Sequence, residues 1–358
     1  MYDYRYLENF IKDLFVEAGC SEDSALLVAK ILLAAELRGI PSHGVIRIKD
    51  YHHHCKIGRI NTSPNIKIVH ESPGTAVVDG DNGIGMIPAV YSMNLAIEKA
   101  RNCGTGWVAT KNSNHYGIAG FYAMMALEHD MIGISLTNAN PTVAPTFSID
   151  RLLGTNPIAV AIPAMKQPPF VADFATTPVA RGKLTVAQKK GENIPTGWAQ
   201  DKYGNPTEDA GIIEKGGAML PLGVDRLHGS HKGYCLGAIV DIFSAVLSGA
   251  NFGPWVPPSV AFLPLLDETV GEGTGHFFGA IRIDGFMKPD EFKTRMDQWI
   301  ETMRNSKHVE GQPDVMIPGD PERENEERFR KTGISIIPAV AKDLKEIADK
   351  AGVEFEIR

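Results

Sequence analysis

The segment from Pro41 to Tyr51, P-S-H-G-V-I-R-I-K-D-Y, contains side chains that could act together on an acid. If Ser42 caps a helix there, the four-residue spacing places His43, Arg47 and Tyr51 along one face. A guanidinium matches a carboxylate with its planar fork, a phenol adds a hydrogen bond, and an imidazole transfers a proton near neutral pH. The pattern therefore predicts a site for an anionic substrate. A surface helix with solvated charges is the alternative.

A second candidate site lies in residues 111–120, K-N-S-N-H-Y-G-I-A-G, between an expected strand and an expected helix. Ligand sites of α/β proteins gather at such junctions. Glycines let the backbone approach a ligand closely, and His115 would hold an imidazole against it. The alternative is an asparagine-rich turn that contains a histidine by chance.

Two later segments are suited to a nucleotide. Asp173 stands at the end of an apolar strand with hydroxyl residues behind it, so its carboxylate can accept hydrogen bonds from ribose or amide groups. Lys232 stands in a glycine-rich turn, H-G-S-H-K-G-Y, before an expected helix, where an ammonium favours a phosphate. Residues 317–325, I-P-G-D-P-E-R-E-N, have the composition of an exposed charged loop.

The histidines and cysteines do not predict a metal site. The run of histidines at 52–54 would point in three directions on a helix, so the rings could not converge on one ion. His228 and His231 are better spaced, but no acid or cysteine is expected to join them, and Lys232 would repel a cation. The cysteines form no CxxC pair and are expected to be reduced thiols. They are Cys20, Cys55, Cys103 and Cys235.

Composition excludes several classes of protein. The 358 residues are 43% hydrophobic, enough for about two domains of an ordinary globular protein. A net charge of -7 argues against a nucleic-acid partner, because phosphate binding needs a concentrated basic face. No apolar run approaches the roughly 20 residues that span a bilayer, and the N-terminus is too polar for a secretory signal. We therefore expect a cytoplasmic protein without a membrane partner.

Hydrophobic periodicity predicts a mixture of helices and strands. Helices are expected at 4–19, 21–37, from Ser42 onward, and at 87–103, 118–129, 233–248, 289–304 and 338–350. Strands are expected at 66–69, 76–79, 106–110, 131–137, 158–162, 170–174 and 277–284. The alternation in the middle of the chain favours an α/β sheet covered by helices. We expect a helical subdomain at 1–65, an α/β domain for cofactor and substrate at 66–285, and C-terminal helices at 286–358 that pack back on the helical subdomain.

The motif G-x-G-x-x-G, which follows the first strand of ordinary dinucleotide-binding domains, is absent: D-G-D-N-G-I-G-M and G-E-G-T-G both break its spacing. Six other motifs are present, namely S-H-G-V-I-R, N-S-N-H-Y-G, G-T-N-P-I-A, D-F-A-T-T-P-V-A-R-G-K, H-K-G-Y-C-L and I-P-G-D-P-E. In their order and spacing, over nearly the whole chain, the sequence resembles the malate/L-lactate dehydrogenase family. That resemblance implies a non-Rossmann α/β fold that binds NAD or NADP, and a homodimer whose site the neighbouring subunit could complete.

The resemblance also implies roles for residues. His115 and His43 are the catalytic candidates for proton transfer, and Arg47 and Tyr51 are the substrate-binding candidates. The implied cofactor contacts are Asp173, Phe174, Ala175, Lys232, Pro318, Gly319 and Asp320. Asp320 stands where the family often has glutamate, so the choice between NAD and NADP stays open, and Arg323 is close enough in sequence to meet a 2′-phosphate.

The expected reaction is reversible hydride transfer between nicotinamide and a small 2-hydroxy/2-oxo acid, with malate/oxaloacetate as the first choice of substrate. We favour His115 as the acid/base, with His43 either sharing that role or polarising the carbonyl oxygen. Lactate, sulfolactate and ureidoglycolate are alternative substrates, and NADPH-dependent reduction of a cyclic-imine carboxylate is an alternative reaction. A non-catalytic NAD(P)H-binding protein is the alternative from another class. The residue that would bind a second substrate carboxylate is not evident from the sequence.

Overall fold

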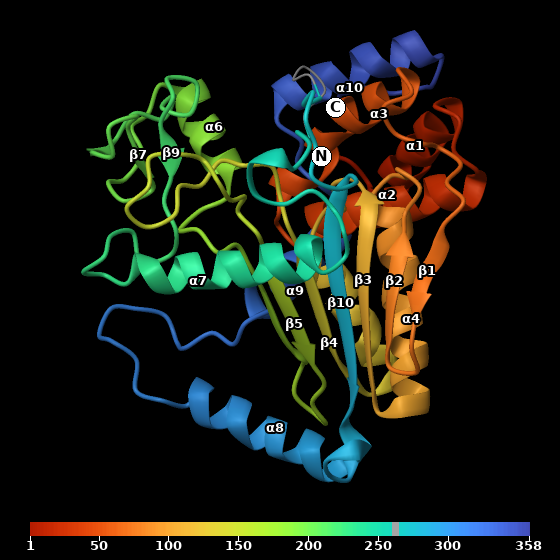
Figure 1. Cartoon of the computed structure of the whole chain (residues 1–358), viewed down its shortest axis with the longest axis vertical. Helices are drawn as coiled ribbons and strands as arrows, with labels where there is room; N and C mark the ends of the chain where they lie inside the picture. Colours follow the sequence, from red (N-terminus) through yellow and green to blue (C-terminus); the bar gives the residue numbers. More distant parts are fainter. Residues whose placement is uncertain (260–264) are drawn as a thin grey trace.

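The centre of the molecule is a seven-stranded sheet in the order β1-β2-β3-β10-β4-β5-β6 (Figure 1). The computed structural model describes residues 1–259 and 265–358. The strands are β1 (Lys67–Glu71), β2 (Thr75–Asp79), β3 (Thr105–Ser113), β4 (Met131–Thr137), β5 (Ile158–Ile162), β6 (Phe170–Phe174) and β10 (Thr274–Arg282). Within this sheet β2 and β3 pair in parallel and every other described pair is antiparallel. The expected α/β fold without Rossmann topology is confirmed.

Helices cover both faces of the sheet. On one face lie α4 (Met86–Cys103) and α5 (Ala119–Met125), which contact β3, β10, β4 and β5. On the other face lie α7 (Ser230–Asp241) and the π-helical turn η4 (Ile242–Val246), which contact β4, β10 and β3. Gly133 and Gly275 permit this close packing, because an added Cβ would lie 2.0 Å from the Ala123 carbonyl oxygen and 2.1 Å from that of Ser244. The late strand β10 is therefore buried between two helical layers.

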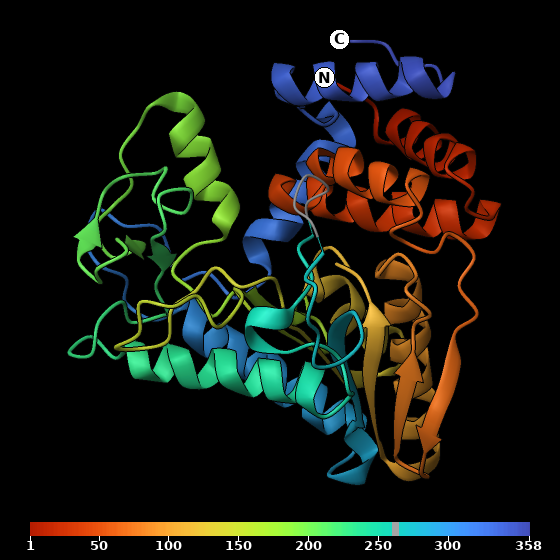
Figure 2. The same cartoon turned by 45° about the horizontal axis from the view of Figure 1, so that its top comes forward.

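A group of helices from both ends of the chain lies at one end of the sheet (Figures 1 and 2). It contains α1 (Tyr4–Glu17), α2 (Glu22–Leu37), α3 (Ile48–Lys56) and α10 (Pro338–Ala351). Asp3 and Ser21 cap α1 and α2 through backbone N–H groups, as N-cap residues do. Phe355 packs against Phe10 with ring centroids 4.5 Å apart, and Tyr2 accepts a backbone hydrogen bond from Arg358, so the two termini lie side by side.

The prediction that an α-helix begins at Ser42 is wrong. Residues Pro41–His43 and Val45–Arg47 form two separate 3₁₀ turns, and the α-helix α3 begins only at Ile48. Gly44, at φ -95° and ψ -139°, interrupts the helical path. The buried carboxylate of Glu36 accepts the Val45 N–H at 2.8 Å, so a side chain from α2 replaces the bond that a continuous helix would make.

A small lobe is built from residues between β6 and α7, where no helix or strand was expected. It contains α6 (Arg181–Lys190) and a three-stranded sheet in the order β8-β7-β9. The strands are β7 (Ala199–Gln200), β8 (Pro206–Thr207) and β9 (Ala218–Met219). This lobe has its own buried cluster, which includes Leu184, Ile194 and Met219, and Figure 2 shows it standing apart from the terminal helices.

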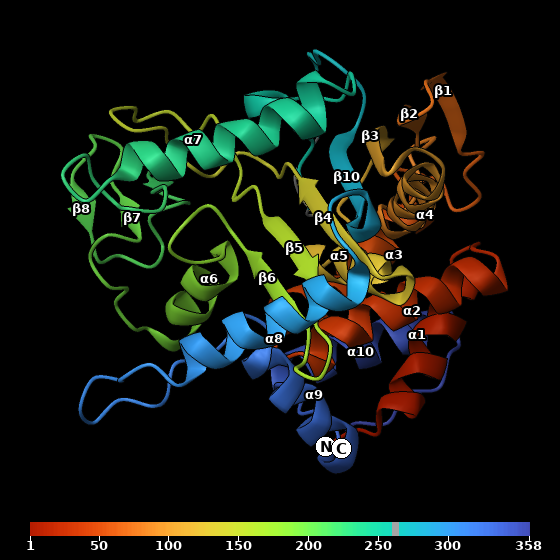
Figure 3. The ribbon, with the colours of Figure 1, turned by 90° about the horizontal axis from the view of Figure 1, so that it is seen from below.

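The C-terminal segment divides into two parts, which differs from the expectation that all of 286–358 returns to the N-terminal helices. Helix α8 (Pro289–Arg304) runs across the far end of the sheet near β6 (Figure 3). It is held there by Asp297, whose carboxylate accepts the backbone N–H groups of residues 165–167. Helix α9 (Asp320–Thr332), which contacts α2, was not expected, because it buries no residue and so has no apolar stripe. Helix α10 contacts α1 and α3.

Among the described residues, every helix is too short or too polar to cross a membrane.

Candidate active site

The structure brings His43, Arg47, Tyr51 and His115 into one cluster. The rings of His43 and His115 are stacked, with centroids 5.4 Å apart and an interplanar angle of 24°. The Tyr51 hydroxyl shares a hydrogen bond of 2.5 Å with His115 Nδ1. Three of the residues come from the turns before α3 and from α3 itself, and His115 comes from the loop between β3 and α5.

The turn at residues 41–47 presents His43 and Arg47 to this cluster. The hydroxyl of Ser42 lies 2.9 Å from His43 Nδ1, which leaves Nε2 facing away from that contact. Arg47 donates from Nε to the Ser42 carbonyl oxygen at 2.8 Å. Within the described residues its two terminal nitrogens make no hydrogen bond or ion pair. The fork of the guanidinium is thus available for a carboxylate.

The loop that carries His115 is held by close backbone contacts. The Asn114 amide donates to the carbonyl oxygens of Asn82 and Gly83 at 3.2 and 2.9 Å. A Cβ on Gly85 would lie 1.9 Å from the Asn114 carbonyl oxygen, so only glycine fits there. His115 Nδ1 accepts the Gly117 N–H at 3.3 Å and also meets the Tyr51 hydroxyl, so the neutral ring carries its proton on Nε2, from which it can donate to a substrate oxygen.

Both imidazoles are neutral near pH 7. Each ring keeps some exposed surface, but the surrounding protein atoms disfavour charge. Burial, reinforced by Arg47, lowers the pKa of His43 to about 3. Burial, with His43 and Arg47 as further causes, lowers the pKa of His115 well below its ordinary value. A bound carboxylate would offset the Arg47 charge and so move both pKa values back up.

Two of the predicted cofactor segments lie next to each other. The Val171 N–H of strand β6 donates to the Pro318 carbonyl oxygen at 2.9 Å, which places Gly319 and Asp320 beside the strand that ends in Asp173 and Phe174. Asp173 accepts the Gly120 N–H on Oδ2 at 2.7 Å. The surrounding atoms raise the pKa of Asp173 to about 6, although one side of the carboxyl group is open to solvent.

The Phe174 side chain is 41% exposed although it is a large apolar group. Ala175 follows it directly, and Thr176 anchors the segment through a backbone hydrogen bond of 2.9 Å to Thr155. An exposed aromatic ring beside a partly open carboxylate is a surface on which a planar ring can stack.

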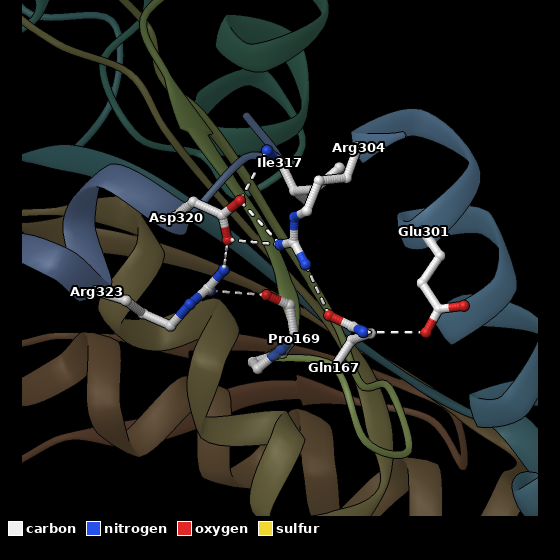
Figure 4. A network of polar contacts seen from close by, with 7 residues as sticks. All are labelled: Gln167, Pro169, Glu301, Arg304, Ile317, Asp320 and Arg323. Atoms are coloured by element: carbon white, nitrogen blue, oxygen red, sulfur yellow. Dashed lines mark hydrogen bonds and ion pairs between the residues drawn. The ribbon is translucent and has the colours of Figure 1, made fainter. Parts of the chain in front are cut away.

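Asp320 is fully engaged by neighbouring groups (Figure 4). Its Oδ2 accepts from Arg304 at 3.0 Å and from the Ile317 N–H at 2.9 Å, and its Oδ1 accepts from Arg304 and Arg323. Burial opposes the charge on Asp320, but the Ile317 amide and the two guanidinium groups outweigh it and lower the pKa. Arg323 also donates to the Pro169 carbonyl oxygen at 2.9 Å. The segment expected as a loop is therefore the braced start of α9.

Lys232 lies apart from that network, in the first turn of α7. Its side chain is exposed, and its ammonium makes no hydrogen bond or ion pair within the described part of the chain. The chain just before α7 approaches β6, because the Leu222 N–H donates to the Thr176 carbonyl oxygen at 3.0 Å. The structure shows no contact of Lys232 with Asp173 or Asp320.

Two residues near the cluster were missed from the sequence. Glu36 is 5% exposed and holds the turn that carries His43 and Arg47. Arg181 begins α6, and Gly182 lies beside Ser42, since an added Cβ there would be 3.2 Å from the Ser42 Cβ. Glu36 has no local signal, and Arg181 lies in the motif D-F-A-T-T-P-V-A-R-G-K, which does not show that its segment packs against Ser42.

The histidines outside the cluster do not form a metal site: no group of three potential ligands is found among the described residues. His52 lies 3.0 Å from Glu17. The expectation that His228 has no acidic partner is wrong, because its Nδ1 lies 2.6 Å from Asp225 Oδ2 across a single turn.

Comparison with known proteins places these features in a family. The sequence pattern of the malate/L-lactate dehydrogenase family matches residues 2–345. The chain is 44% identical to a malate dehydrogenase of Pyrococcus horikoshii over 97% of this chain and 94% of that protein. It is 40% identical to an L-sulfolactate dehydrogenase of Methanocaldococcus jannaschii over 98% and 96% of the two chains. A solved malate dehydrogenase of Entamoeba histolytica, 33% identical, covers 99% of both chains with a TM-score of 0.92. The protein therefore belongs to the malate/L-lactate dehydrogenase family.

Proposed function

We propose that this protein interconverts a small 2-hydroxy acid and its 2-oxo acid with NAD or NADP, and that malate and oxaloacetate are its substrates. The observation that carries the proposal is the unpaired fork of Arg47 beside two neutral imidazoles. The relatives named as malate dehydrogenases support the choice of substrate.

Arg47 would bind the carboxylate next to the reacting carbon through its two terminal nitrogens. His115 would donate its Nε2 proton to the 2-oxo oxygen in the reduction and take a proton back there in the oxidation, with the Tyr51 hydroxyl and the Gly117 N–H holding the ring at Nδ1. His43, stacked on His115, would place its free nitrogen against the same oxygen. When bound, the nicotinamide supplies the hydride acceptor or donor.

The residues near β6 fit a nicotinamide dinucleotide. Asp173 has used Oδ2 for the Gly120 N–H, and its Oδ1 has no partner among the described residues, so it can accept from a ribose hydroxyl or a carboxamide. The exposed Phe174 ring and Ala175 would border the same ligand. Lys232 supplies an ammonium that has no partner in the described part of the chain, which suits a phosphate.

We infer a preference for NAD over NADP. The carboxylate of Asp320 already accepts four hydrogen bonds, so its role is to hold the Pro318–Gly319 turn rather than to bind a ribose. Arg304 and Arg323 are neutralised in part by the same carboxylate. A 2′-phosphate would have to compete with Asp320 for them.

We further propose that the protein is a cytoplasmic homodimer. Helix α7 and turn η4 expose an apolar face that a second copy would cover: Ile239, Ile242, Phe243, Val246 and Leu247. All four cysteines are free, as in a reducing compartment.

The test follows NADH and NADPH absorbance with oxaloacetate, pyruvate, sulfopyruvate and a cyclic-imine carboxylate, and NAD⁺ reduction with malate and ureidoglycolate. We expect the highest kcat/KM with oxaloacetate and NADH. Preference for the cyclic imine with NADPH would favour an imine reductase. Binding of NADH without turnover of any substrate would favour a non-catalytic role and contradict the proposal.

A further inference from the structure

A second guanidinium group lies near the cluster, on a segment of the small lobe. Arg181 is the first residue of α6 in the small lobe, and the neighbouring Gly182 packs against Ser42. Ser42 is also the residue whose carbonyl oxygen binds Arg47 Nε at 2.8 Å. Arg181 and Arg47 thus flank the same short turn, which carries His43.

The surroundings leave Arg181 without a direct counter-charge. Burial and the positive charge of Arg47 lower the pKa of Arg181, while Glu214 raises it. Glu214 accepts instead from the Gln188 amide at 2.8 Å, and no hydrogen bond or ion pair joins it to Arg181 among the described residues. The nearby Arg151 adds more positive charge and is itself bound to the carbonyl oxygens of Gly217 and Ile213.

Two guanidinium groups that lie near each other, with no ion pair to either among the described residues, repel. A ligand with one negative charge would pair with one of them and leave the other uncompensated. A ligand with two separated negative charges would compensate both. The arrangement therefore favours a dianionic substrate over a monoanion of similar size.

We propose that Arg181 binds the distal anionic group of the substrate, while Arg47 binds the carboxylate next to the reacting carbon. This assignment rests on the proposed 2-oxo acid reduction and names the residue that selects among 2-oxo acids. The preferred class is a short 2-oxo acid with a second carboxylate or a sulfonate at C3. Pyruvate, which has a methyl group there, is the disfavoured substrate.

The experiment compares Arg181→Gln and Arg181→Lys with the unmodified protein, using oxaloacetate and pyruvate with NADH. The control is Lys190→Gln, which removes an equal charge from the exposed far end of the same helix. We expect Arg181→Gln to lower kcat/KM for oxaloacetate by about 10- to 100-fold, mainly through KM, because a charged hydrogen bond is lost. Turnover of pyruvate should stay unchanged or rise. Arg181→Lys should recover part of the loss, and Lys190→Gln should change neither.

Three results would overturn the assignment. Equal losses with oxaloacetate and pyruvate would make Arg181 a general structural residue. A raised KM for NADH with an unchanged KM for oxaloacetate would place Arg181 against the dinucleotide. Reduction of pyruvate but not oxaloacetate by the unmodified protein would refute the distal anion site while leaving 2-oxo acid reduction intact. If the protein reduces neither acid, the proposed function itself fails.

Discussion

Glu36→Gln tests whether a buried carboxyl group limits stability at neutral pH. Glu36 is 5% exposed, has no ion pair among the described residues, and has a pKa raised by burial to about 7, with the Val45 N–H bond opposing the shift. In the unfolded chain the group ionises near its ordinary pKa of 4.5. Between these values the unfolded state is ionised and the folded state is not, so stability falls as the pH rises from about 4.5 to 7.

The size of the effect follows from the shift. The pKa of Glu36 is about 7 in the folded state and 4.5 in the unfolded state. At about 1.36 kcal/mol for each unit of pKa, this difference costs about 3 kcal/mol of folding free energy at pH 7.5 and above. Glutamine keeps an acceptor for Val45 N–H but cannot ionise. The free energy of unfolding of Glu36→Gln relative to the unmodified protein should therefore rise by about 3 kcal/mol between pH 4.5 and 7.5.

Urea unfolding at half-unit steps of pH, followed by circular dichroism, measures this difference. The neutral histidines titrate in both proteins and cancel, and any fixed effect of the new amide shifts the whole curve without changing its slope. Glu98→Gln, on the exposed side of α4, is the matched control and should show no such slope. A difference between Glu36→Gln and the unmodified protein that is independent of pH would refute the reasoning.

Three further outcomes are expected. His115→Ala should slow single-turnover hydride transfer by about 10²- to 10⁴-fold, and His43→Ala should slow it less. Stopped-flow measurements test both variants. If both react at rates near that of the unmodified protein, neither imidazole is the acid/base group. Asp320→Ala should release Arg304 and Arg323 and so raise kcat/KM for NADPH relative to NADH in steady-state assays. An unchanged ratio would show that these guanidinium groups do not face the 2′ position. Leu247→Asp, on the apolar face of α7 and η4, should shift sedimentation towards monomer, while Phe286→Asp, exposed elsewhere, should not; a dimer that persists in Leu247→Asp would exclude this face.

The regular elements with a strong apolar pattern were predictable. Helices α1, α2, α4 and α8 and strands β4, β5 and β6 follow the periodicity closely, since each buries one face or both. Elements without that pattern were not predictable. Helix α9 buries nothing, and the strands of the small lobe are two residues long.

The sequence predicted which residues gather in the candidate cluster but not how they are arranged; their roles stay a prediction. The sequence analysis brought His43 and Tyr51 together on one face of a continuous helix. The two residues do lie in one cluster, but the helix is broken between them at Gly44 and by the buried Glu36. Periodicity could not reveal that His115 would stack on His43, since that contact depends on how the helical group seats on the sheet. The roles of the residues came from family resemblance alone. For Asp320 the resemblance implied a cofactor contact, but ion pairs with Arg304 and Arg323 occupy its carboxylate.

The position of β10 has a consequence for synthesis on the ribosome. This strand, residues 274–282, inserts between β3 and β4, so both of these strands have an open edge until more than three quarters of the chain has emerged. The sheet cannot be completed while only the N-terminal part of the chain has been synthesised. During translation two strand edges therefore stay unpaired and can pair with other chains. Pausing shortly before residue 274 would prolong that vulnerable interval, whereas release of the whole chain lets the missing strand close the sheet.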